Sequence, residues 1–365
     1  MDSPDQDAVL AEVDRFATRW LEPRCVRPEL PLTSRDLDAT LVEARTLGIV
    51  ATADPGLGLW EDLDDTLSRS LRVLVRIARA NAGVALAFHL ESLARVLLRR
   101  LGFEAEGPGL AAVFGRYGIG RSALARFLAG VQLDEDDRAL LLDVFGASDR
   151  LVTGHDGFSW LLWPAMEDRG TVRWCLTTTP TIRRHPHAHG FDELATFSVR
   201  PGMRRMGTDC TEETANRALF AEALTLHALG LVAIALGSAQ RAHGLARSFA
   251  ATRRQGGKTI DGHPAVQLLL ASSRGAITSV EGSLEALGQR SIRGASIGRV
   301  FSVRAEAHPL LCRGANDALQ VFGGMGYMRD VGLEKVVRDL NHLRALGGSP
   351  PELALFVSAW EMHGG

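Results

Sequence analysis

Residues Ala315–Ser349 read ANDALQVFGGMGYMRDVGLEKVVRDLNHLRALGGS, and the rest of the chain can be interpreted outward from them. The first part, Ala315–Val321, contains good helix formers and no breaker. The glycines that follow allow backbone angles that other residues avoid, and N–H groups in such a turn can hold phosphate oxygens. Spacing of three and four then predicts an amphipathic helix with one apolar stripe, made of Leu333, Val336, Val337, Leu340, Leu343 and Leu346. Spacing alone leaves two interpretations open, a plain turn between bundle helices and a phosphate-binding turn.

The same stretch resembles the C-terminal signature of the acyl-CoA dehydrogenase family. In that family a helix ends in Gln-x-x-Gly-Gly-x-Gly-aromatic, a helix with Arg-Asp follows, and a loop of the form (Tyr)-Glu-Gly-Thr closes the motif. The matching residues are Gln320, Gly323, Gly324, Gly326 and Tyr327, then Arg338 and Asp339, then Leu346-Gly347-Gly348-Ser349. Gly347 therefore occupies the place of the family's usual catalytic Glu.

A second motif lies upstream of this signature. Arg253-Arg254-Gln255-Gly256-Gly257 is similar to the family's Arg-x-x-Phe-Gly turn, and His263 follows in the family's register. The resemblance implies FAD, gripped by these residues across a subunit boundary. Arg253 suits a pyrophosphate because its planar fork forms charge-assisted bonds, although by itself it is an ordinary cation at a helix C-terminus. The candidate cofactor-binding residues are Arg253, Gln255, His263, Gln320, Gly323, Gly324, Gly348 and Ser349.

The catalytic base is the point at which the sequence departs from the family. Dehydrogenation of an acyl thioester needs a group that removes the α-proton, and Gly347 has no side chain to do so. Some family members carry their Glu on the long helix instead, at the position that aligns with His227. The resemblance therefore makes His227 the candidate catalytic residue, as a base or an acid. A buried histidine packed on an apolar helix face is the alternative.

The pattern predicts a mainly α chain with an acyl-CoA dehydrogenase-like arrangement. We expect an N-terminal helical domain over 1–150, a shortened β-domain over 151–205 and a C-terminal four-helix bundle domain over 206–365. Segment Leu110–Gly130 is expected to be helical. The β-domain is predicted from three aromatic and β-branched runs, Phe158–Trp163, Thr171–Thr177 and Ala195–Val199. The family's ring-supporting Thr-Glu-Pro-x-x-Gly-Ser-Asp motif is not found, which leaves open whether FAD is retained, weakly bound or absent.

Composition narrows the possible partners. The net charge of -2 favours neither nucleic acid nor an anionic membrane surface. The apolar run Leu224–Ala239 falls short of a membrane span and predicts a buried bundle helix. The 4 cysteines lack metal or disulfide spacing and indicate reduced thiols in a cytoplasmic protein. The alternating His185, His187 and His189 favour an exposed loop over a metal site, so no metal is predicted.

Three functions remain open from the sequence. The first is an FAD-dependent oxidoreductase acting on an acyl thioester of CoA or a carrier protein. The second is a non-catalytic subunit that completes the FAD site of an active paralogue. The third is a dehydratase or isomerase on the same fold, using His227. Apolar faces on the long helices predict a homodimer, a homotetramer or a hetero-oligomer with a paralogous subunit.

Overall fold

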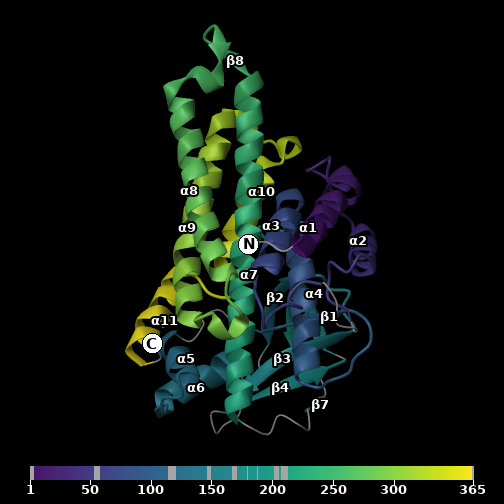
Figure 1. Cartoon of the computed structure of the whole chain (residues 1–365), viewed down its shortest axis with the longest axis vertical. Helices are drawn as coiled ribbons and strands as arrows, with labels where there is room; N and C mark the ends of the chain where they lie inside the picture. Colours follow the sequence, from purple (N-terminus) through teal and green to yellow (C-terminus); the bar gives the residue numbers. More distant parts are fainter. Residues whose placement is uncertain are drawn as a thin grey trace.

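The computed structural model describes residues 4–52, 58–113, 121–145, 149–166, 171–178, 180–186, 188–200, 205–206 and 213–363. Its axis is one helix, α7 (Glu213–Thr252), which runs from the strands at one end of the molecule to a small hairpin at the other (Figure 1). At 1.5 Å per residue, its 40 residues span about 60 Å. The mainly α prediction is confirmed, and the position of every other element can be given relative to α7.

The N-terminal helices are α1 (Pro4–Phe16), α2 (Ser34–Thr46), α3 (Ser68–Ala80) and α4 (Ala82–Arg100). Thr33, rather than the neighbouring serine, caps α2 in a capping box with Asp36. Asn81 separates α3 from α4, because its extended backbone ends one helix while its side-chain oxygen accepts the Val84 N–H at 3.0 Å. On either side of this turn, α3 and α4 both pack against α7.

Two small sheets and two short helices lie at the end of the molecule where α7 begins (Figure 1). One sheet has the order β1-β3-β4-β7 and the other β2-β6-β5. The helices α5 (Arg121–Leu128) and α6 (Glu135–Phe145) lie between β1 and β2 in the chain. The strands are β1 (Gly109–Ala111), β2 (Arg150–Gly154), β3 (Trp160–Met166), β4 (Val172–Thr177), β5 (Thr181–His185), β6 (Ala195–Arg200) and β7 (Arg205–Met206).

The expected helix over Leu110–Gly130 is wrong at its start. Residues Gly109–Ala111 form β1, which pairs in parallel with β3, and the helix begins at Arg121. All three β1 residues are buried, so a short apolar run carried no sign of which regular structure it would adopt. The β-region also begins earlier than predicted and contains β5, whose exposed, charged sequence lacks a strand pattern.

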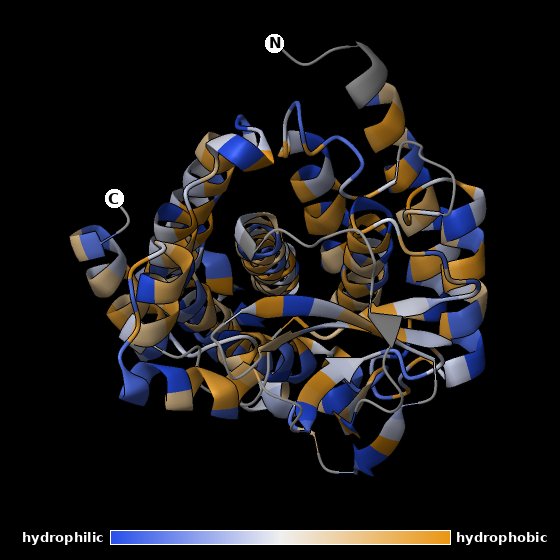
Figure 2. Ribbon diagram, turned by 90° about the horizontal axis from the view of Figure 1, so that it is seen from below, coloured by the Kyte–Doolittle hydropathy of each residue, from blue (hydrophilic) through white to orange (hydrophobic). Residues whose placement is uncertain are grey.

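The C-terminal region is a helical bundle around α7. It contains α8 (Pro264–Gly288), α9 (Ile297–Phe322), α10 (Leu333–Ala345) and α11 (Pro350–His363). Seen end-on, the helices lie side by side and the strands lie along one side of them (Figure 2). By length and composition α7 is the one helix among the described residues that could cross a membrane, but 83% of its apolar window is buried inside the molecule. It is the core helix of the bundle, as the sequence predicted.

Candidate functional site

Three of the predicted cofactor residues lie at the hairpin that follows α7. The hairpin consists of β8 (Arg254–Gln255) and β9 (Lys258–Thr259). Gly256 and Gly257 form its turn at φ 61° and 81°, values that a two-residue hairpin turn requires and that glycine adopts without strain. The His263 ring donates from Nε2 to the Gln255 carbonyl at 3.1 Å. His263 and the Gln255 main chain therefore hold the turn, while the Arg253 side chain is exposed.

The glycine turn after α9 lies at the same end of the bundle. The Phe249 and Phe322 rings stack with centroids 4.1 Å apart. Phe249 is one turn before Arg253, and Phe322 directly precedes Gly323, so this stack brings the two predicted motifs to one place. Gly323 has φ 59°, and a Cβ added to it or to Gly324 would meet no atom within 4 Å. The turn is thus accessible to a ligand, as is the exposed Gln320.

Gly348 and Ser349 lie elsewhere in the bundle. The Ser349 hydroxyl and N–H each donate to Glu352 Oε2 at 2.8 Å, which caps the start of α11. Arg304 of α9 contacts this loop and precedes Gln320 by 16 residues, so about 24 Å of helix separates the two groups of predicted cofactor residues. The structure brings six of the eight residues together at the hairpin end and leaves these two apart.

Arg304 was not predicted and is the residue that fixes the loop around Gly347. It is fully buried, and its guanidinium donates to the carbonyls of Leu346, Gly347 (3.0 Å) and Gly348 (3.4 Å). Burial lowers the pKa of Arg304 to about 9, so it remains a cation at neutral pH. Gly347 has φ 61°, a value that favours glycine. The only signal in the sequence was a charged residue at helical spacing among mainly apolar positions of α9.

His227 is buried on α7 and belongs to a chain of three aromatic side chains. The Trp60 indole donates from Nε1 to His89 Nδ1 at 3.1 Å, and His89 Nε2 lies 3.2 Å from His227 Nδ1. Since an indole only donates, a neutral His89 carries its proton on Nε2 and donates it to His227. Neutral His227 therefore carries its own proton on Nε2. Gly230 makes room for this chain, because a Cβ there would lie 2.4 Å from the His89 ring.

Electrostatics favour the neutral form of both rings. Burial lowers the pKa of His89 to about 3. Burial first, and then His89 and Arg304, hold the pKa of His227 well below its usual value. Trp60 itself is fully buried with φ 67°, a strained backbone for a residue with a side chain. The sequence placed His227 but gave no sign of His89, which is 138 residues away.

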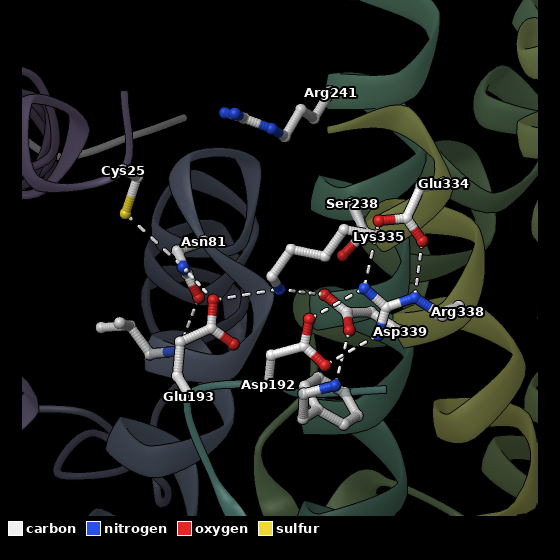
Figure 3. A network of polar contacts seen from close by, with 12 residues as sticks. Cys25, Asn81, Asp192, Glu193, Ser238, Arg241, Glu334, Lys335, Arg338 and Asp339 are labelled. Carbon is white, nitrogen blue, oxygen red and sulfur yellow. Dashed lines mark hydrogen bonds and ion pairs between the residues drawn. The ribbon is translucent and has the colours of Figure 1, made fainter. Parts of the chain in front are cut away.

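The Arg-Asp pair of the signature connects α10 to the loop before β6 (Figure 3). Arg338 forms two bonds to Asp192, at 2.7 and 2.8 Å, and these bonds lower the pKa of that carboxyl. Asp339 accepts the Phe191 N–H at 2.6 Å and pairs with Lys335 at 2.7 Å.

Lys335 extends that connection to the N-terminal helices. It also pairs with Glu193 at 3.0 Å, and Glu193 accepts from Asn81 at 2.7 Å. Burial opposes the Lys335 charge, but Asp339 and Glu193 outweigh burial and raise the pKa of the ammonium. This network joins the turn between α3 and α4, the loop before β6 and the bundle.

Of the three spaced histidines, His185 and His189 lie in the described part of the chain. His185 lies on β5 and bonds Ser198 at 2.7 Å, and His187 falls outside the described residues. Within the described ranges, no group of three or more His, Cys, Asp or Glu side chains is placed to hold a metal.

Comparison with known proteins finds a family match in the C-terminal region of the chain. Residues 217–352 match the family model for the acyl-CoA dehydrogenase C-terminal domain. A curated relative, 3-sulfinopropanoyl-CoA desulfinase of Paraburkholderia xenovorans, is 34% identical over 176 residues, which are 46% of this chain and 42% of that protein. The chain therefore matches less than half the length of that relative.

Two solved structures share the fold over nearly the whole chain. Butyryl-CoA dehydrogenase from Megasphaera elsdenii superposes with a TM-score of 0.76 at 17% identity, covering 99% of this chain and 100% of that one. The prolyl acyl carrier protein oxidase AnaB gives a TM-score of 0.75 at 14% identity, covering 98% and 99%. Residues 217–352 therefore match the C-terminal domain of acyl-CoA dehydrogenases, and the chain as a whole has the fold of these solved structures.

Proposed function

We propose that this chain takes part in FAD-dependent oxidation of an acyl thioester, carried by CoA or by a carrier protein. The observation that carries the proposal is the exposed group at the hairpin end of the bundle, where Arg253, Gln320 and the Gly323-Gly324 turn lie together. A cation, an amide and open main-chain N–H groups form a donor set that fits an anionic pyrophosphate. The residues present are therefore compatible with FAD.

The roles of the chain's own residues follow from their placement. Arg253 would bind the pyrophosphate by charge-assisted bonds, and the Gly323 turn would let its oxygens approach the main chain. When bound, FAD supplies an acceptor for hydride. These groups project from the end of the bundle, about 24 Å along α9 from the loop at Gly348, so we assign them to the FAD of a neighbouring subunit.

His227 remains the candidate catalytic residue. With its proton held on Nε2 by the Trp60–His89 chain, neutral His227 can donate a hydrogen bond to a developing negative charge. Serving as a base would require it to accept a proton at Nδ1, where His89 donates. Its tautomer therefore supports the acid role over the base role.

A second candidate function is a non-catalytic subunit paired with an active paralogue. The observation that favours it is the loop at Gly347, which offers no carboxylate and whose carbonyls are held by Arg304. Such a chain would contribute the hairpin end to its partner's FAD and would lack a complete site of its own. Both candidates use Arg253 and Gln320 in the same way, and they differ in whether this chain holds its own flavin.

One experiment tests the proposal and separates its two forms. The protein is purified alone and after co-expression with an intact family member, and flavin per chain is measured from the visible absorption spectrum. Flavin on the protein alone supports the oxidoreductase, and flavin only in the mixed complex supports the non-catalytic subunit. Flavin in neither preparation, even with added FAD, contradicts both.

A matched pair of variants tests the residue assignment. Arg253→Ala should weaken flavin retention by about 1.5–3 kcal/mol, or at least tenfold, because a charged hydrogen bond is lost. Arg299→Ala removes an equally exposed arginine near the start of α9 and should leave retention unchanged. Equal flavin content in the two variants would show that Arg253 does not contact the cofactor.

A further inference from the structure

A basic groove lies between α7, α8 and the end of α3, and shares no residue with the hairpin end or the His227 chain. Its volume is about 490 Å³. The lining residues are Arg79, Gln240, His243, Gly244, Arg247, Ser248, Ala251, Arg274 and Ile277. Of the residues that the structure describes, three arginines and a histidine line it and no acidic residue does.

Helical spacing explains why these side chains converge. The α7 contributors lie three or four residues apart along one stripe of the helix. Arg274 and Ile277 face them from α8, and Arg79 comes from the last turn of α3. A Cβ on Gly244 would meet no atom within 4 Å, so this glycine leaves the floor of the groove open.

The charges in the groove are poorly neutralised. Within the described part of the chain, neither Arg79 nor Arg247 has an acidic partner within 4.0 Å, and Arg274 has one, Glu281 at 3.3 Å. Like charges held together repel one another, and an anion between them would remove that cost. Arginine forks are also suited to bidentate contacts with phosphate.

His243 lies among these arginines. Its Nδ1 is buried without a hydrogen-bond partner, so Nε2 is the ring nitrogen available to a ligand in the groove. Burial, and then Arg274 and Arg247, lower the pKa of its imidazole. Both arginines line the same groove as His243. A bound anion would reverse the effect of those charges.

We propose that this groove is a binding site for a ligand with clustered phosphates, the chemistry shared by inorganic diphosphate, nucleoside diphosphates and the nucleotide end of CoA. The ligand contacts Arg247 of α7 and Arg274 of α8 together. The groove shares no residue with the hairpin end, so ligand binding in the groove does not depend on whether the hairpin end binds flavin.

Isothermal titration of the purified full-length protein near physiological salt tests the site, with inorganic diphosphate, ADP and CoA as probes. We expect all three to bind, and binding to weaken about tenfold or more in Arg247→Gln and in Arg274→Gln. Arg299→Gln controls for the loss of a positive charge outside the groove. The titrations use Arg253→Ala as the background, because the proposed flavin site would itself bind diphosphate. Flavin retention should be unchanged in Arg247→Gln and Arg274→Gln, which separates the two sites. CoA that binds tenfold tighter than ADP identifies the thioester carrier as the source, and equal affinities identify a free nucleotide.

Two further variants keep the test independent of charge. Gly244→Leu should abolish binding by filling the groove, while Gly244→Ala should preserve it.

Affinity should also rise as pH falls from 8 to 6, because bound phosphate stabilises protonated His243. The other charged groups at the groove are Arg79, Arg247, Arg274 and, paired with Arg274, Glu281. His243→Gln should flatten the dependence. Absence of binding by every probe, or affinities unchanged by Arg247→Gln and Gly244→Leu, would overturn the proposal.

Discussion

Replacing Lys335 by Met tests whether the ion pairs of Lys335 with Glu193 and Asp339 stabilise the protein. The change keeps most of the side-chain volume and removes the charge. It leaves Glu193 and Asp339, with side chains only 1% and 3% exposed, without their shared cation. Breaking a buried ion pair by removing one partner typically costs about 3–5 kcal/mol. Each carboxylate keeps one hydrogen-bond donor, Asn81 for Glu193 and the Phe191 N–H for Asp339. We therefore expect a loss of stability in the lower half of that range.

The pH dependence of that loss has a definite sign. Burial already raises the pKa of Asp339, and removing Lys335 raises it further. At pH values between its unfolded-state and folded-state pKa, a carboxyl with a raised folded-state pKa binds more protons in the folded state than in the unfolded state. The free energy of unfolding of the variant should therefore recover as pH falls through that window, and decline as pH rises.

The assay is urea unfolding at one fixed protein concentration, followed by circular dichroism at several pH values from 5 to 8. Lys258→Met provides the control, because Lys258 is the exposed lysine of the hairpin. Adding Asp339→Asn to Lys335→Met should restore part of the stability by removing a buried charge. A loss below about 1 kcal/mol, with no recovery at low pH, would show that the network does not bear on stability as described.

The remaining predictions concern the site and helix packing. Gly347→Glu should raise acyl-CoA oxidation in a flavin-loaded preparation, since a general base contributes about 10²–10⁴-fold; the φ of 61° there costs the variant roughly 1–3 kcal/mol, so thermal unfolding is recorded beside activity. His227→Ala should abolish any native activity, and an unaffected rate would assign catalysis to another group. Gly237→Ala should destabilise the protein by about 1–3 kcal/mol in urea, because the new Cβ would lie 2.3 Å from a main-chain oxygen of α3, whereas Gly244→Ala should not.

The parts of the fold that the sequence predicted are those with local signals. The apolar stripe from Leu333 to Leu346 repeats at helical spacing, and Asn81 is a strong cap between two helices. β1 and β5 were missed because a strand of three buried residues, or one of exposed charges, is defined by its neighbours in the sheet rather than by its own pattern.

The candidate site also contains residues with a local sequence signal and residues without one. Arg253, Gln320 and the glycines could be proposed from the sequence because each belongs to a short motif that resembles one of the family's. Arg304 and His89 were missed because their roles depend on contacts with segments 42–44 and 138 residues away, which no local pattern records. The tautomer of His227 follows only once Trp60 is seen to donate into His89.

The hairpin at the end of α7 has a consequence for how the cofactor would be kept. Its strands are only two residues long, and Arg253 beside them is exposed, so this tip cannot enclose a ligand by itself. If the FAD contacts proposed here are correct, the second half of each cofactor site arrives only when another subunit does. Flavin retention would then depend on protein concentration, and dilution below the assembly constant would release the cofactor without any chain unfolding.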